Sequence, residues 1–255
     1  SGKDSPDSGT FPSLIAKNPA TAGKKFSQEE LLQFYRGVVE EVSSLIPQGS
    51  ISIEVYADTA TTADEMLKQG REFFKWIPNA HIKYPTTVEG LKAAEISVAE
   101  GIRVNMTLVF SQMQAAAVYA ATKGAKKGQV FISPFVGRLD DRGENGMDLI
   151  ANIIKMYSQG DGHVEILSAS VRGLRHFTKS MEMGADIITA PLKTLKEWAD
   201  AGKPQVLADA PDLGQKPILY ENISLEKSYR EYDIRHELTD KGLAKFAQDW
   251  NNLIE

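Results

Sequence analysis

The hydrophobic and polar positions of the chain alternate between two periodicities, one typical of strands and the other typical of helices. Short runs rich in β-branched and aromatic residues predict strands at residues 51–57, 81–84, 102–108, 130–135, 164–170 and 186–190. Segments with helical spacing lie between them, at residues 31–42, 62–76, 87–98, 111–122, 147–157, 174–181 and 192–199. Regular alternation of strand and helix predicts βαβ units and a parallel sheet.

The number of strands and the glycine pattern decide between two α/β architectures. An open, doubly wound sheet typically carries a glycine-rich phosphate-binding turn, and neither GxGxxG nor GxxxxGK[ST] occurs here. A (β/α)8 TIM barrel needs eight strands, and 255 residues is its usual size. Six strands are clear and a seventh is predicted near residues 8–13. We therefore expect an α/β fold, a TIM barrel whose first strand is missing or altered in this chain.

The composition along the chain indicates a single domain. No Pro-, Gly- or Ser-rich linker interrupts it after residue 30, so we expect one barrel domain over residues 11–255. Residues 1–10 are polar and turn-rich, which predicts a disordered or altered N-terminal segment. A C-terminal helix is predicted over 241–253, with an apolar stripe that seals the barrel or contacts another subunit. The stripe consists of Leu243, Phe246, Trp250 and Leu253.

Charge and cysteine content narrow the classes of function. The net charge of -5, with no block of Lys or Arg, argues against nucleic acid or an anionic membrane as the main partner. Zero cysteines exclude disulfides and thiolate metal sites, and the four scattered histidines show no metal-ligand spacing, so no metal is expected. No apolar stretch approaches the roughly 20 residues of a membrane span, and the first residues do not resemble a signal peptide. We expect a soluble, cytoplasmic protein.

One lysine stands inside a short apolar strand. Lys83 lies in the run AHIKYP, and an unpaired buried ammonium costs several kcal/mol unless it is paired or neutralised. A desolvated lysine can lose its proton, attack a ketone and form a Schiff base. The structural alternative is that Lys83 caps the end of the strand and extends its amine to water.

The predicted carboxyl ends of the strands share a chemical character. In a barrel these ends line the active site. They offer one amine, one carboxylate, an amide, hydroxyls and two guanidiniums: Lys83, Glu54, Asn105, Thr107, Ser133, Ser170, Arg138 and Arg172. This set suits a polyhydroxylated, phosphorylated ketone, because the arginine fork donates two parallel hydrogen bonds to phosphate. Each residue alone also has a structural explanation, such as strand propensity or a solvated loop position.

Five motifs, occurring in order, are similar to those of the transaldolases and the related fructose-6-phosphate aldolases. They are SLIAK at 13–17, ISIEV at 51–55, IKYPTTVEG at 82–90, GIRVNMTLVFS at 101–111 and ISPFVGR at 132–138, and ASVR at 169–172 fits as well. The resemblance covers about residues 11–255. It implies a TIM barrel that works without metal or organic cofactor, in the pentose phosphate pathway. The implied reaction transfers a dihydroxyacetone unit from sedoheptulose 7-phosphate or fructose 6-phosphate to an aldose phosphate.

The resemblance also implies a role for individual residues near the reacting carbons. Lys83 is similar to the Schiff-base lysine of the family. Glu54 and Thr107 resemble the pair that holds the catalytic water for proton transfer. Asn105 and Ser133 resemble the contacts to the dihydroxyacetone part of the substrate. These five residues form the expected reaction centre.

A second group resembles the phosphate-binding set of true transaldolases. It consists of Arg138, Ser170 and Arg172. Phe135 is also similar to transaldolases, since fructose-6-phosphate aldolases usually carry a tyrosine there. The expected partners are therefore sugar phosphates, and a homo-oligomer is an open expectation. An aldolase-like enzyme, a sugar-phosphate isomerase or lyase without covalent catalysis, and a catalytically impaired sugar-phosphate-binding barrel stay open as alternatives.

Two features near the N-terminus depart from the family pattern. Family members begin with a strand that ends in an aspartate, which acts as general acid and base on the hydroxyl of the cleaved bond. Asp4 and Asp7 lie instead in the turn-rich decapeptide. The family motif Thr-Thr-Asn-Pro-Ser is replaced here by GTFPS at 9–13, so Phe11 stands where the asparagine amide is expected. These departures motivate the alternative of an impaired barrel.

Overall fold

The core of the molecule is a parallel sheet of six strands. The computed structural model describes residues 15, 21, 23–206 and 214–254. The strands pair in sequence order, each parallel to the next. They are β1 (Ile51–Glu54), β2 (Ala80–Pro85), β3 (Val104–Val109), β4 (Val130–Pro134), β5 (Val164–Ser168) and β6 (Ile187–Ile188). The predicted strand near 8–13 lies outside the described residues.

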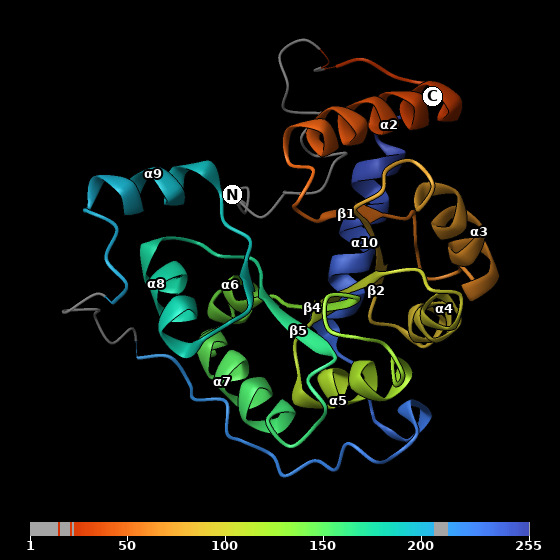
Figure 1. Ribbon diagram of the computed structural model, residues 1–255. Coiled ribbons are helices and arrows are strands. Elements are labelled where there is room, and N and C mark those ends of the chain that lie inside the picture. Colours follow the sequence, from red (N-terminus) through yellow and green to blue (C-terminus); the bar gives the residue numbers. More distant parts are fainter. Residues whose placement is uncertain (1–14, 16–20, 22, 207–213, 255) are drawn as a thin grey trace.

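The sheet is curled, and helices cover its outer side (Figure 1). α3, α4, α5, α7 and α8 follow one another around the curve. The helices are α2 (Gln28–Leu45), α3 (Ala63–Phe73), α4 (Val88–Ala99), α5 (Gln112–Ala121), α6 (Val136–Asp140), α7 (Gly146–Tyr157), α8 (Leu174–Met183), α9 (Leu192–Asp200) and α10 (Glu237–Asn251), with a 3-10 turn η1 (Tyr229–Glu231). This parallel half-barrel is consistent with a partial TIM barrel; the described residues do not show the full eight-stranded barrel.

Polar caps define where several of the helices begin. Ser27 and Thr62 each accept a backbone hydrogen bond from the third helical residue, and the glutamate there bonds back to the cap. These capping boxes satisfy amide groups that the first turn of a helix leaves free. Thr87 caps α4 in the same way through its hydroxyl. Thr87 lies two residues after the end of β2, so this cap sets the direction in which the chain leaves the strand and enters α4.

The strands bury both faces, and alternate residues point to opposite sides. On β2, Ile82 and Tyr84 point outward to α3, where a Cβ on Gly70 would lie 2.0 Å from the Tyr84 hydroxyl oxygen. The Tyr84 hydroxyl also bonds the Ser97 hydroxyl on α4, at 3.1 Å. Lys83, between these two residues, therefore points to the concave side of the sheet.

Several predicted boundaries change in the structure, and the largest changes among the strands are at β1 and β6. β1 ends at Glu54 because the backbone amide of Tyr56 bonds the Gln69 side chain, 2.9 Å away, and leaves the ladder. β6 is reduced to two residues. The predicted loop over 137–146 contains a single helical turn, α6, because the amides of Val136 and Gly137 bond backbone carbonyls that follow β5. This turn has no side-chain cap, so no capping signal marked it in the sequence.

The C-terminal helix packs against its own chain. α10 begins at Glu237, earlier than predicted, because the His236 imidazole accepts the Leu238 amide hydrogen at 3.2 Å. Figure 1 shows α10 beside β1 and β2. At its other end the Trp250 ring packs against the rings of Tyr35 and Tyr56, each 6.3 Å away. The expected apolar stripe therefore covers the half-barrel.

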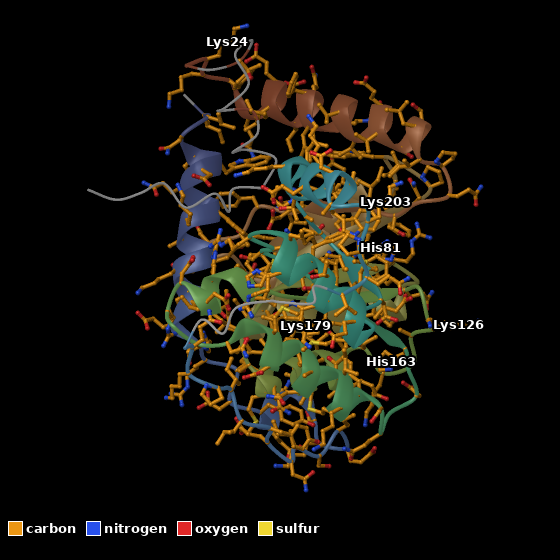
Figure 2. The ribbon with its side chains drawn as sticks, turned by 90° about the vertical axis from the view of Figure 1, so that its left-hand side faces the viewer. Lys24, His81, Lys126, His163, Lys179 and Lys203 are labelled. Atoms are coloured by element: carbon orange, nitrogen blue, oxygen red, sulfur yellow. The ribbon has the colours of Figure 1, made fainter. Side chains whose placement is uncertain are left out.

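Four of the lysines on the outer surface lie in separate places. Figure 2 labels Lys24, Lys126, Lys179 and Lys203, and these four lysines lie well apart from one another. They do not form one basic patch. In the described part of the chain, no helix is both long and apolar enough to cross a membrane.

Alanine substitutions at two helical glycines, one in close contact and one exposed, test the packing of helices on the sheet. Replacing Gly90 by alanine places a Cβ 1.9 Å from the Pro85 carbonyl oxygen, so we expect a loss of about 2 kcal/mol or more in the free energy of unfolding. Gly37 lies on the exposed side of α2 with no atom near its missing Cβ. Gly37→Ala should therefore raise the free energy of unfolding by about 0.5–1 kcal/mol. Urea unfolding measures both, and equal stability of the two variants would contradict the close approach at Gly90.

Candidate active site

A lysine and a glutamate lie side by side at the carboxyl end of β1 and β2. The sheet register pairs Glu54 with Lys83. Their side chains form an ion pair, with the Lys83 Nζ 3.6 Å from the Glu54 Oε1, and each is only 19% exposed. The Glu54 backbone amide also donates to the Tyr35 hydroxyl at 2.8 Å. Glu54 therefore pairs with the strand lysine itself, not with a surface lysine.

The environment of Glu54 sets its acidity. Burial raises the pKa of this carboxyl above its ordinary value, while the positive charges of Lys83 and Arg138 oppose the rise. Desolvation disfavours the charged form of a carboxyl, and nearby cations favour it. The carboxyl is thereby easier to protonate than an exposed glutamate would be. Such a group suits reversible proton transfer.

A row of polar side chains continues across the concave side. Asn105 on β3 donates its amide hydrogen to the Ser52 hydroxyl at 2.9 Å. Ser133 on β4 donates its hydroxyl hydrogen to the Asn105 amide oxygen at 2.7 Å. Because Lys83 and Asn105 are paired in the sheet register, this row lies directly beside the lysine. The structure therefore brings Asn105 and Ser133 next to the lysine and glutamate.

Thr107 presents a hydroxyl that the described residues leave without a partner. Its side chain is 1% exposed, and its Oγ1 makes no hydrogen bond within the described part of the chain. Its backbone carbonyl is occupied by the amide and hydroxyl of Thr86, at 2.9 and 2.8 Å. The next residue, Leu108, has a φ of 61°, and the strand register shifts there. An unpaired buried hydroxyl beside an irregular backbone makes Thr107 a candidate for a functional role.

Two aromatic rings cover the cations of this region. The Lys83 Nζ lies 5.7 Å from the centre of the Phe246 ring on α10. The Arg138 guanidinium lies over the rings of Phe135 and Phe246, at 5.2 and 5.4 Å. Phe246 also lines a small pocket with Glu54 and Pro85. The sequence predicted that Phe246 belongs to the apolar stripe of the C-terminal helix. No pattern in the sequence indicated that its ring contacts Lys83 and Arg138.

The predicted phosphate residues lie on two segments that approach each other closely. The Gly137 amide donates to the Ser170 carbonyl at 3.1 Å. A Cβ on Gly137 would lie 2.2 Å from that carbonyl oxygen and 2.6 Å from the Arg172 Nε, so only glycine fits here. The Arg172 guanidinium forms an ion pair with Asp141. Neither Arg138 nor Arg172 is therefore a solvated loop residue; Arg172 is only 18% exposed.

The nine expected residues fall into two neighbouring groups. Lys83, Glu54, Asn105 and Ser133 are linked by register and hydrogen bonds on the concave side, with Thr107 on the same strand as Asn105. Arg138 adjoins this group through Phe246, whereas Arg172 follows β5 and lies against Gly137, next to Arg138 in the chain. Asp4, Asp7 and Phe11 lie outside the described residues.

The described residues hold no cluster of potential metal ligands. Three or more His, Asp or Glu side chains suited to one ion are not found together in the described ranges. His81 stacks on Phe131, with ring centres 4.0 Å apart, and its pKa falls to about 4 because it is buried. His163 lies elsewhere (Figure 2), paired with Asp161. The independence of the reaction from metal and cofactor stays a prediction.

The fold and the site define a class of protein: a parallel α/β half-barrel with a buried lysine and carboxylate at the carboxyl ends of its strands. Residues 7–255 match the family model of transaldolase/fructose-6-phosphate aldolase. The chain therefore belongs to the transaldolase/fructose-6-phosphate aldolase family.

Curated relatives support the same family. A protein named probable transaldolase from Dehalococcoides mccartyi is 35% identical over 239 residues, which cover 94% of this chain and 88% of the relative. Probable transaldolases from Roseiflexus sp. and Brucella ovis are 36% and 38% identical. These matches cover 92% and 94% of this chain, and 86% and 84% of the two relatives. The similarity therefore extends over nearly the whole chain.

The unpaired hydroxyl of Thr107 gives a stability test. Thr107→Val removes a buried polar group that has no partner, so the free energy of unfolding should stay equal or rise by up to about 1 kcal/mol. Ser133→Ala removes the hydrogen bond to Asn105 and should lower the free energy of unfolding by about 1 kcal/mol. Urea unfolding separates the two expectations. A loss in Thr107→Val as large as in Ser133→Ala would mean that the hydroxyl has a structural bond.

Proposed function

We propose that the protein is a transaldolase that transfers a dihydroxyacetone unit through a Schiff base on Lys83. The observation that carries the proposal is the half-buried ion pair of Lys83 and Glu54 at the carboxyl ends of neighbouring parallel strands. Family membership and the probable transaldolases among the relatives support it. Carboxyl ends of parallel strands are also where α/β barrels carry their chemistry.

In the proposed reaction the neutral amine of Lys83 attacks the C2 carbonyl of a ketose phosphate. Water leaves and an imine forms between Nζ and C2. The protonated imine draws electrons from the C3–C4 bond while a base takes the proton of the C4 hydroxyl, so the bond breaks and releases an aldose phosphate whose former C4 is now the aldehyde. The three-carbon enamine left on Lys83 then attacks the aldehyde of an acceptor sugar phosphate, the aldehyde oxygen takes up a proton, and water hydrolyses the new imine. Electrons balance in each step without an external oxidant or reductant.

Glu54 and Thr107 support the proton transfers of imine formation. Losing water from the carbinolamine requires an acid, and hydrolysing the imine requires a base. A carboxyl whose pKa is raised by burial suits both roles, because its pKa lies closer to neutral pH than that of an exposed carboxyl. It can therefore both donate a proton and take one up. The Thr107 hydroxyl has hydrogen-bonding capacity left for a water molecule. A water held by these two side chains would carry the proton to and from the carbon-bound oxygen.

The remaining residues suit the two ends of a ketose phosphate. Asn105 and Ser133 form one hydrogen-bonded pair beside Lys83 and suit the hydroxyls of the dihydroxyacetone unit. Arg138 and Arg172, with Ser170, supply positive charge and donors for the phosphate. Phe135 supports a transaldolase over an aldolase, because the aldolases usually carry tyrosine at this position.

Borohydride trapping tests the covalent step. Incubation with fructose 6-phosphate and borohydride should add mass to the protein, and peptide mapping should place the addition on Lys83. Lys83→Arg should abolish labelling, because a guanidinium keeps its proton and cannot act as the nucleophile. Lys155, on the outer helix α7 against Tyr220, provides a matched control, so Lys155→Arg should label like the wild type. Labelling at another lysine, or none at all, would contradict the proposal; labelling without transfer would favour the impaired barrel.

Replacing Arg172 by alanine tests whether its guanidinium binds the phosphate of the substrate. Arg172→Ala should raise the KM for phosphorylated acceptors and leave unphosphorylated acceptors little changed. A lost charge-assisted hydrogen bond is worth about 1.5–3 kcal/mol, which corresponds to roughly 10- to 150-fold in KM. Arg71→Ala, which removes a surface ion pair with Glu100, should change neither KM. Equal losses for both acceptor types would mean that Arg172 is structural.

A further inference from the structure

A half-buried aspartate and a buried histidine lie between the two segments that carry the arginines. Asp140 is the last residue of α6, two positions after Arg138. His176 lies in the first turn of α8, four positions after Arg172. The His176 Nε2 lies 2.7 Å from the Asp140 Oδ2, and the two side chains are 5% and 12% exposed. The pair was not expected from the sequence, where both residues have ordinary structural explanations.

The hydrogen bonds of His176 reach directly to Arg172. The Arg172 backbone amide donates to the His176 Nδ1 at 3.2 Å. Because Nδ1 accepts this bond, the imidazole proton sits on Nε2 and is donated to Asp140. A single ring therefore links the backbone of Arg172 to the end of α6.

Asp140 is itself held from several sides. Its Oδ1 accepts the Gly146 amide at 2.9 Å. Arg175 lies 3.5 Å from its Oδ2 and also donates to the Gln215 side chain at 3.0 Å. Burial tends to raise the pKa of Asp140, but the hydrogen bonds of the His176 side chain, the Gln215 side chain and the Gly146 amide outweigh it and hold the pKa at about 2. Both carboxylate oxygens of Asp140 therefore accept hydrogen bonds.

The backbone at this contact is strained, so it needs support. Ser170 is not a glycine and yet has a φ of 60°, in the left-handed region. Such a conformation persists only where neighbouring contacts impose it. The Val136 and Gly137 amides, which bond the carbonyls of Ala169 and Ser170, supply part of that support. The link between Asp140 and His176 holds the same two segments together from the other end.

We propose that Asp140 and His176 are positioning residues for the phosphate of the substrate. They fix the backbone of Arg172 against α6, so that the guanidiniums of Arg172 and Arg138 meet the phosphate in one geometry. Neither touches the substrate in this proposal, which rests on the phosphate role given above to Arg138 and Arg172. A fixed arrangement of donors lowers the cost of ordering them when the ligand binds.

Two substitutions at His176 separate its two hydrogen bonds. In His176→Gln the side-chain amide reaches the position of Nε2 and still donates to Asp140, but the acceptor for the Arg172 amide is lost. In His176→Asn the amide oxygen takes the place of Nδ1 and still accepts from Arg172, but the bond to Asp140 is lost. If the link to Arg172 matters most, the asparagine variant recovers part of the affinity that the glutamine variant loses.

A second buried histidine in the chain provides a matched control. His163 pairs with Asp161 and contacts the Thr122 hydroxyl at 3.1 Å, and none of its hydrogen bonds reaches a proposed site residue. His163→Gln therefore makes the same chemical change in a similar environment. It should affect folding stability but not the binding of phosphate.

The experiment measures binding and turnover separately. Calorimetry with erythrose 4-phosphate and with inorganic phosphate should show about tenfold weaker binding in His176→Gln, a smaller loss in His176→Asn and no loss in His163→Gln. Steady-state kinetics should show a matching rise in KM for erythrose 4-phosphate, with the KM for erythrose and the kcat within about twofold of wild type. Thermal unfolding confirms that each variant is folded, and Asp140→Asn replaces any His176 variant that is not.

The results distinguish this proposal from the proposed function. If the wild type binds phosphate but is not labelled by borohydride, the Schiff-base reaction fails while the positioning role is still measured by calorimetry. If Arg172→Ala binds phosphate as the wild type does, the phosphate site itself is wrong. If Arg172→Ala weakens binding but His176→Gln and Asp140→Asn do not, the positioning role is overturned. An equal loss in His163→Gln would also overturn it, since stability alone would then explain the effect.

Discussion

The parallel register of the first three strands is the constraint on which the site depends. It places Glu54 beside Lys83, and Lys83 beside Asn105, in one row across the sheet. In a parallel sheet successive side chains point to opposite faces, so these three share the concave side while Ile82 and Tyr84 pack on the helices. A slip of one residue in β2 would turn the lysine into the helical layer and leave an unpaired ammonium there. The strand pairing that buries the core therefore also brings these three side chains together.

The cations of the candidate site have partners within the protein. The Lys83 amine has Glu54 and a phenyl ring as neighbours, and Arg172 has Asp141. Asp141 is 56% exposed, so its pairing with Arg172 is screened by water on one side. If Arg172 binds the phosphate as proposed, the phosphate would replace Asp141 at the guanidinium, and the Asp141 carboxylate would be solvated by water. The half-buried Asp140, which is bound on both oxygens, is not replaced in this way.

Much of the fold could be predicted from the sequence because its signals are local. Six strands and the helices between them follow from periodicity and from caps such as Ser27 and Thr62. The resemblance to transaldolases also named the residues that the sheet brings together around Lys83. Other features depend on distant contacts. The single turn of α6 is held by carbonyls after β5, and the contacts of Phe246 and His176 join segments far apart in the chain. No local pattern marks such contacts.

The position of α10 has a consequence for how the protein is made. Thr239 bonds the Leu108 carbonyl, Gly242 lies against Leu108 and Arg138, and Phe246 lies near Lys83. All three belong to a helix that the ribosome synthesises about a hundred residues after Arg138. Strands β1 to β4 therefore emerge during translation with the concave side uncovered. In the growing chain the polar row around Lys83 therefore stays open to water until α10 is added, and Lys83 gains the cover of the Phe246 ring only after its own strand has been made.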